Sequence, residues 1–195
     1  YLSNYNTAWV NTTAENQQAI DRSVFPVNQG GPFMAAIAAK AVCFGEALQP
    51  GFSQYAARVV ENAQKLAATL VEGGLRIVTG GTDTHLFLVD LTSMELTGRD
   101  AEEAMSAVGI YANRNTIPND KKSARVTSGL RIGTPALTTR GMGPEEMETV
   151  GKLIIRTVTN IGDEAVAKEV KDEVAKLTGR FPVPGITTDN AWPLQ

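Results

Sequence analysis

The pattern of apolar and polar positions changes near residue 75. Before that point, apolar residues recur at helical spacing and predict helices over 32–48 and 52–73. After it, short aliphatic runs alternate with amphipathic stretches, which predicts strands and helices following one another. The first 29 residues are rich in Asn and Thr, and they predict a loop with a short helix over 14–22 and an extended stretch over 23–29.

The two long helices predicted before residue 75 differ in their apolar surfaces. The helix over 32–48 is rich in alanine, which suits close packing against a neighbour; Pro32 fits its first turn and Pro50 stops it. The helix over 52–73 has one apolar face and ends at two glycines. That face consists of Ala56, Val59, Ala63, Leu66 and Leu70.

The stretch after residue 75 predicts a compact α+β domain with a small, mostly antiparallel sheet. The predicted strands are 75–80, 85–91, 110–116 and 125–133, and the predicted helices are 97–109, 143–161 and 163–179. Thr97 and Asp100 are spaced as a capping box at the start of the first of these helices. The helix over 143–161 is expected to bury Met147, Val150, Ile154, Val158 and Ile161.

These patterns divide the chain into four parts. We expect the margin of one domain over 1–50, a connecting helix over 51–74, the compact α+β domain over 75–182 and a Pro-rich tail over 183–195. The chain begins at Tyr1 with a polar stretch, so we expect it to be a piece of a longer protein.

Composition narrows the class of protein. The chain has 195 residues, of which 43% are hydrophobic and 20% charged, with a formal net charge of -3, so no global basic field indicates nucleic-acid binding. Cys43 is the only cysteine, which favours a cytoplasmic setting, and we expect it in a core. No apolar run approaches the roughly 20 residues of a membrane span.

Positive charge is concentrated between residues 110 and 140. Six basic residues stand there against one acidic residue, Asp120, a local excess of five positive charges that favours a small anionic ligand or, alternatively, a solvated turn. The basic residues are Arg114, Lys121, Lys122, Arg125, Arg131 and Arg140.

Arg131 stands out because aliphatic residues flank it. Alternation places Leu130 and Ile132 on one face of a strand and Arg131 on the other. If that strand is central, we expect the guanidinium to be partly buried and paired. Two interpretations stay open: a structural pair with Asp or Glu, or bidentate binding of a ligand carboxylate.

Two other features bear on chemistry. Gly30 and Gly31, in "NQGGP", let a backbone approach a ligand closely before a helix N-terminus, although such a start is often only a turn. His85 is the only histidine, which excludes a site with two histidine ligands and favours a structural role. No metal-ligand spacing and no Walker or GxSxG motif occurs.

Five blocks occur in one order: "FPVNQGGPFMAAIAAKAV", "GGTDTHLFLVDL", "TGRDAEEAM", "NRNTIPND" and "TSGLRIGTPALTTRG". Together they resemble the C-terminal portion of the serine hydroxymethyltransferase family, from about Val24 to Pro182. The resemblance implies an α/β enzyme of the aspartate-aminotransferase-like fold (fold type I), which depends on pyridoxal 5'-phosphate. It also implies a homodimer or a dimer of dimers.

The implied reaction interconverts serine plus tetrahydrofolate with glycine plus 5,10-methylenetetrahydrofolate. By resemblance, Arg131 binds the amino-acid carboxylate, and Gly30 and Gly31 contact the cofactor phosphate of the partner subunit. Asn115 matches an asparagine near the folate pterin. The folate-contacting loop corresponds to Ser123, Ala124 and Arg125, where the bacterial pattern has Pro-Phe in place of Ala124-Arg125.

The family's Schiff-base lysine belongs to a Thr-His-Lys-Thr motif that this sequence does not contain. We therefore expect no catalytic residue, and no activity, in the isolated chain. Three alternatives stay open: a small-anion binding module without catalysis, a dimerisation module, and another fold-type-I enzyme such as a threonine aldolase. We expect no metal, nucleic-acid or membrane partner.

Overall fold

The computed structural model describes residues 13–185. The chain forms two compact units, Tyr1–Ala47 and Leu48–Gln195, and each is described by itself. The loop predicted over 1–12 and most of the predicted tail, 186–195, lie outside the described residues.

The first unit is helical. It contains α2 (Ala14–Arg22), the turn η1 (Ser23–Asn28) and α3 (Met34–Ala47). The helix predicted over 14–22 is confirmed, but the extended stretch predicted over 23–29 is wrong except at Phe25 and Gln29. The backbone folds into a turn there, because Gln29 N donates to Val24 O (2.7 Å) and Asn28 Nδ2 donates to Ser23 O (2.7 Å).

The helix α3 is apolar on most of its surface. It begins at Met34, so Pro32 precedes the helix instead of lying in its first turn. Within its own unit none of its residues is buried, and Cys43 is exposed and not in a core as predicted. A helix that is apolar all round is typical of one covered by other chain segments.

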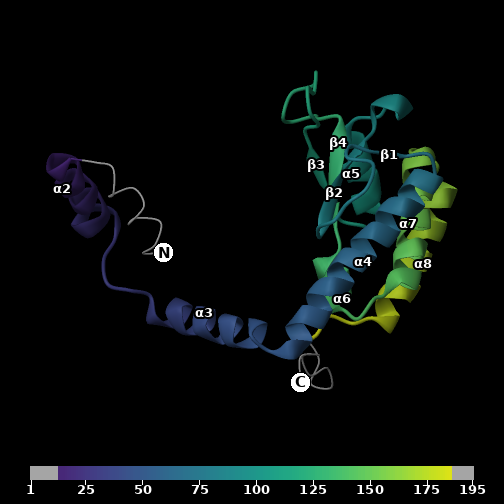
Figure 1. Cartoon of the computed structure of the whole chain (residues 1–195). Coiled ribbons are helices and arrows are strands. Elements are labelled where there is room, and N and C mark those ends of the chain that lie inside the picture. Colours follow the sequence, from purple (N-terminus) through teal and green to yellow (C-terminus); the bar gives the residue numbers. More distant parts are fainter. Residues whose placement is uncertain (1–12, 186–195) are drawn as a thin grey trace. The chain divides into compact units, whose positions relative to one another are not determined.

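The second unit has two layers (Figure 1): a four-stranded sheet, and helices on one face of it. The strand order is β1-β2-β4-β3 and every pairing is antiparallel, which confirms the prediction of a small, mostly antiparallel sheet. The strands are β1 (Arg76–Ile77), β2 (Leu86–Asp90), β3 (Asn113–Asn115) and β4 (Gly129–Gly133). The helices are α4 (Pro50–Glu72), η2 (Thr92–Met94), α5 (Gly98–Ala107), α6 (Pro135–Thr139), α7 (Pro144–Thr159) and α8 (Glu164–Arg180).

The core lies between the sheet and the helices α4, α5 and α7. Alternation along the strands sends one set of side chains inward and leaves the other set outside. The buried set from the sheet is Phe87, Val89, Leu130 and Ile132; from the helices it includes Leu66, Leu70, Met105, Met147 and Ile154.

Local signals explain where the helices begin. Thr97 and Asp100 form the predicted capping box, with Asp100 N donating to Thr97 Oγ1 (3.0 Å) and Thr97 N to Asp100 Oδ2 (3.3 Å). Pro50 is the first residue of α4 and so starts that helix as well as following α3. Of the residues predicted to be buried on α7, Met147, Ile154 and Val158 are buried and Val150 is half-buried, whereas Ile161 lies beyond the helix and is 40% exposed.

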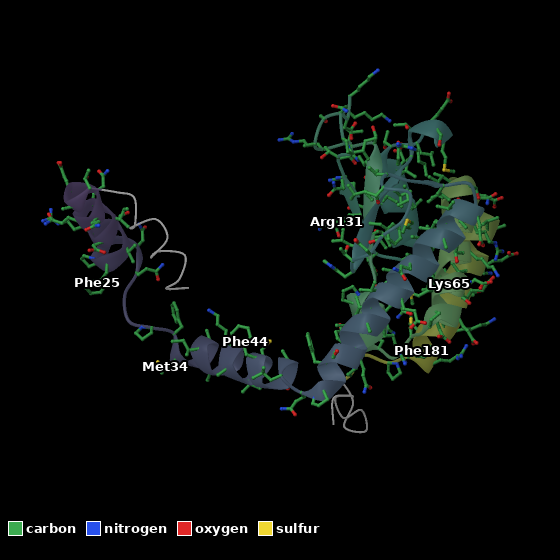
Figure 2. All side chains as sticks on the ribbon, in the orientation of Figure 1. Phe25, Met34, Phe44, Lys65, Arg131 and Phe181 are labelled. Carbon is green, nitrogen blue, oxygen red and sulfur yellow. The ribbon has the colours of Figure 1, made fainter. Side chains whose placement is uncertain are left out.

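An ion-pair network joins α4 to α7. Glu148 on α7 contacts Lys152 (2.6 Å) on its own helix and Lys65 (2.7 Å) on α4, which Figure 2 labels. The two lysines, led by the hydrogen bond from Lys152, lower the pKa of Glu148 from 4.5 to about 2. A lowered folded-state pKa adds stability above the unfolded-state pKa, and that stability is lost as the pH falls through the folded-state value.

Glu148→Gln should therefore reduce the free energy of unfolding near pH 7 and flatten its dependence on pH between 4.5 and 2. Urea denaturation at a series of pH values measures both effects. Glu61→Gln is the matched control, because Glu61 is exposed on α4 and makes no ion pair with any residue in 13–185. Parallel pH profiles for wild type and Glu148→Gln would contradict the assignment.

Candidate functional site

The side of the sheet that faces away from the helices carries the candidate site. β4 lies between β2 and β3, and Arg131 pairs in register with Leu88 and Asn113. Leu130 and Ile132 point into the core, so Arg131 points to the opposite face, which Figure 2 shows on the side away from α7. The predicted alternation around Arg131 is confirmed.

The prediction that a central strand would bury and pair Arg131 is wrong. Arg131 is exposed, and its side chain makes no ion pair or hydrogen bond with any residue between 13 and 185. The reason is that helices cover only one face of the sheet, so an interior strand still has an open side. Of the two interpretations, the structural pair therefore has no partner among the described residues.

Glycines flank the arginine on this open face. Gly133 is exposed and Gly129 is buried, and neither places a side chain of its own on this face of β4. A Cβ atom on Gly129 would lie 2.6 Å from Ile117 Cγ2 and 2.6 Å from Val89 O. Ile117, from the loop after β3, therefore packs over the end of the face at Gly129.

Buried polar contacts fix the end of β4 against α4. Thr134 Oγ1 donates to Val59 O (2.7 Å), and Asn62 Nδ2 donates to Thr138 Oγ1 (2.9 Å) and to Met142 O (3.0 Å). Tyr55 Oη also donates to Pro135 O (3.3 Å). We call these contacts the seam between α4 and the end of β4. The sequence pattern predicted neither the seam nor helix α6, because it gives no sign that an α4 residue contacts a residue some 75 to 80 positions later.

The basic residues of 110–140 divide by their partners. Arg114 pairs with Glu102 (3.1 Å), while Arg140 donates to Phe181 O (2.6 Å) and Thr178 O (3.1 Å). Two of the six basic residues, Arg114 and Arg140, therefore have partners within the unit. Within the described part of the chain, Lys121, Arg125 and Arg131 have no ion-pair partner.

The positions that the resemblance assigned to folate lie at one end of the same unit. Asn115 is on β3 opposite Gly129, two residues along the ladder from the pair Asn113–Arg131. Its Nδ2 donates to Thr116 O (2.7 Å). Ser123, Ala124 and Arg125 are exposed on the loop between β3 and β4. The sheet register thus brings Asn115 and Arg131 to one face, and the loop continues from Asn115.

A cavity of about 420 Å³ opens beside this site. It runs from Arg131 and Asn113 past Tyr111 toward aliphatic residues of α6 and α8, among them Leu137 and Val174. His85 lies at the same end, exposed, before β2. Its backbone carbonyl accepts from Thr134 N (3.1 Å), a contact that does not involve the imidazole, so the structural role predicted for the side chain stays a prediction.

Gly30 and Gly31 belong to the first unit. Both are exposed, a Cβ atom on either would meet no atom within 4 Å, and the loop that contains them leads into α3. Within residues 13–185, neither backbone N–H donates a hydrogen bond. These two adjacent amides are therefore available as donors to an anion such as a phosphate.

Two searches of the described residues were negative. No group of three or more His, Cys, Asp or Glu side chains in 13–185 is placed to hold a metal ion. No helix among these residues is long and apolar enough to cross a membrane.

The fold and the site together define an α/β protein with an open antiparallel sheet whose uncovered face presents an unpaired arginine. The chain belongs to the serine hydroxymethyltransferase family: the model of that family, described as "Serine hydroxymethyltransferase", matches residues 4–154. The match includes most of the segment 1–23, which the sequence blocks did not cover, and it ends before α8. The family implies a fold-type-I, pyridoxal-phosphate-dependent transferase of one-carbon groups, which uses serine or glycine and tetrahydrofolate.

Gly129→Ala tests the packing of the open face. The added Cβ atom meets a backbone oxygen, which cannot rotate away, so we expect a loss of about 1–3 kcal/mol in the free energy of unfolding. Chemical denaturation of the chain measures it. Gly81→Ala is the control and should be close to neutral, because a Cβ atom there has open space. Equal stability of the two variants would contradict the contact with Ile117.

Proposed function

We propose that the chain is the C-terminal part of a pyridoxal-phosphate-dependent enzyme that interconverts serine plus tetrahydrofolate with glycine plus 5,10-methylenetetrahydrofolate. One observation carries the proposal beyond the family: Arg131 stands unpaired on an open sheet face, between two glycines. In this proposal, 1–50 is the C-terminal edge of the large cofactor-binding domain, 51–74 the connecting helix, 75–182 the small domain and 183–195 a tail.

Arg131 binds the carboxylate of the amino-acid substrate. A guanidinium offers two parallel N–H donors, which match the two oxygen atoms of a carboxylate. The Arg131 side chain is exposed and has no competing acidic partner among residues 13–185. The buried contacts of Thr134 and Asn62 keep the end of β4 in place, so the backbone that carries Arg131 is fixed before the substrate arrives.

The folate substrate contacts the end of the open face where β3 leads into the exposed loop. Asn115 offers an amide for the polar edge of the pterin, and Ser123, Ala124 and Arg125 line the approach. At positions 124 and 125 the bacterial pattern has other side chains, so contacts there depend on the backbone or on the cation of Arg125. This folate end of the site favours a hydroxymethyltransferase over a threonine aldolase.

The residues of this chain that would hold the cofactor are Gly30 and Gly31, whose free amides bind the phosphate of pyridoxal 5'-phosphate in the partner subunit. When bound, the cofactor supplies an electron sink for bond cleavage at the amino-acid α carbon. The lysine that anchors the cofactor lies outside this chain. The enzyme is proposed to be a cytoplasmic homodimer or dimer of dimers, with α3 covered by other parts of the assembly.

Arg131→Lys in the full enzyme should raise the serine KM with a smaller effect on kcat, because lysine cannot bind a carboxylate through two parallel donors. Losing that pairing costs about 2–4 kcal/mol, a rise of roughly 30- to 1000-fold in KM. Steady-state kinetics with serine as the varied substrate measures it. Arg99→Lys is the control, because Arg99 pairs only with Glu103 on the surface of α5. An unchanged serine KM would exclude the role assigned to Arg131.

A second candidate function is a small-anion binding module that needs no cofactor. The unpaired Arg131 also favours this function, since an exposed cation can bind an anion without catalysis. Calorimetry on the 195-residue chain distinguishes the two. The proposed enzyme predicts no measurable heat with glycine or folate, whereas heat that disappears in Arg131→Met would identify a stand-alone module.

A further inference from the structure

The loop between β3 and β4 is organised around one carboxylate. Asp120 accepts four hydrogen bonds: its Oδ1 from Lys122 N (2.9 Å) and Ser128 Oγ (2.7 Å), and its Oδ2 from Ser128 N (2.9 Å) and Ile117 N (3.3 Å). These donors come from both ends of the loop, so a single side chain closes it. Neither sequence pattern nor resemblance assigned any role to Asp120 beyond turn chemistry.

The closed loop is anchored to the core through Ser128. Ser128 is buried, and its carbonyl accepts from Leu91 N (2.9 Å), which follows β2. Next to it, Gly98 N donates to Thr127 O (3.1 Å) and Arg99 N donates to Val126 O (3.1 Å). Asp120 therefore connects the exposed part of the loop to a backbone segment that the sheet and α5 already fix.

The backbone of this loop is held in sparsely populated conformations. Asn119 and Thr127 are not glycines, yet they have positive φ values of 59° and 60°. A β-branched residue such as Thr127 is rarely found in this region and persists there when surrounding contacts fix it. The contacts that do so are the hydrogen bonds to Asp120 and the backbone bonds to α5.

The carboxyl group of Asp120 is ionised near neutral pH. The backbone N–H of Lys122 contributes most, with Ser128 and Ile117, to lowering the pKa of Asp120 from 3.8 to about 2. The carboxylate is therefore an acceptor on both oxygen atoms in neutral solution. Each oxygen atom accepts a hydrogen bond from at least one backbone N–H. A donor group in place of either oxygen atom would therefore face another donor.

We propose that Asp120 is a positioning residue that holds Ser123, Ala124 and Arg125 in place beside the open face and so determines affinity for the folate substrate, but not for the amino acid. The proposal rests on the proposed function. Two contacts favour this division: Ile117, bonded to Asp120, packs over Gly129 at the folate end of the face, whereas Arg131 is fixed separately through β4 and α4.

Asp120→Asn in the full enzyme tests the proposal with almost no change of shape. Whichever way the amide is oriented, its NH₂ group faces a backbone donor. We expect the tetrahydrofolate KM to rise by about tenfold or more, comparable to the loss of one hydrogen bond to a charged group, with the serine KM unchanged. Ser128→Ala removes only the Oγ bond and should give a smaller rise.

Limited trypsin digestion of the 195-residue chain measures directly how accessible the loop is to cleavage. Cleavage after Lys121, Lys122 and Arg125 should be faster in Asp120→Asn than in wild type. Asp172→Asn is the matched control for both experiments, because Asp172 is exposed on α8 and its carboxylate has no hydrogen-bond or ion-pair partner in the described range. It should leave cleavage and both KM values unchanged.

The outcomes separate the proposal from the function it rests on. Unchanged cleavage in Asp120→Asn, an unchanged tetrahydrofolate KM, or a serine KM that rises equally would each overturn the positioning role, the last because Asp120 would then support the unit as a whole. If the wild-type enzyme itself binds no folate, the proposed function fails first and the positioning role fails with it.

Discussion

Helices cover only one face of the four-stranded sheet, and the rest of the second unit depends on this constraint. Burial of Phe87, Val89, Leu130 and Ile132 against α4, α5 and α7 fixes which residues of each strand face the core. A shift of one residue in register would turn the whole set outward, so the register is strongly specified. The same alternation leaves Arg131 and Asn113 on the opposite face as a consequence of packing.

Two sets of polar contacts fix the positions of segments that the apolar core does not determine. The seam from α4 to the end of β4 includes buried Asn62, and the loop after β3 closes on Asp120. Burying an amide or bending a loop into left-handed conformations is unfavourable unless hydrogen bonds compensate. Both sets lie beside the open face, where the position of a few side chains matters more than the overall stability of the unit.

Sequence patterns predicted most of the second unit because its elements carry local signals. The capping box of Thr97 and Asp100 and the alternation around Arg131 needed only neighbouring residues. The exposure of Arg131 was mispredicted, since coverage of a sheet face depends on residues far along the chain. Asn62 and the Asp120 loop were missed for the same reason: their partners are distant in sequence or are backbone groups. Cys43 was mispredicted because an apolar helix gives no sign of which segments cover it.

The exposure of Arg131 also limits what it can do by itself. In water, two unit charges about 4 Å apart attract by about 1 kcal/mol, and the attraction grows to about 4 kcal/mol where a protein surface partly screens the pair from solvent. An arginine on an uncovered face therefore binds a carboxylate weakly, because salt and water compete for it. Strong binding requires a second layer over the open face that removes water without pairing with the guanidinium. Such a layer would lie over Arg131 and the exposed Gly133, because Ile117 already covers the face at Gly129. In the proposed enzyme, this chain supplies Arg131 on a fixed strand, and a carboxylate would bind there strongly only when the open face is covered.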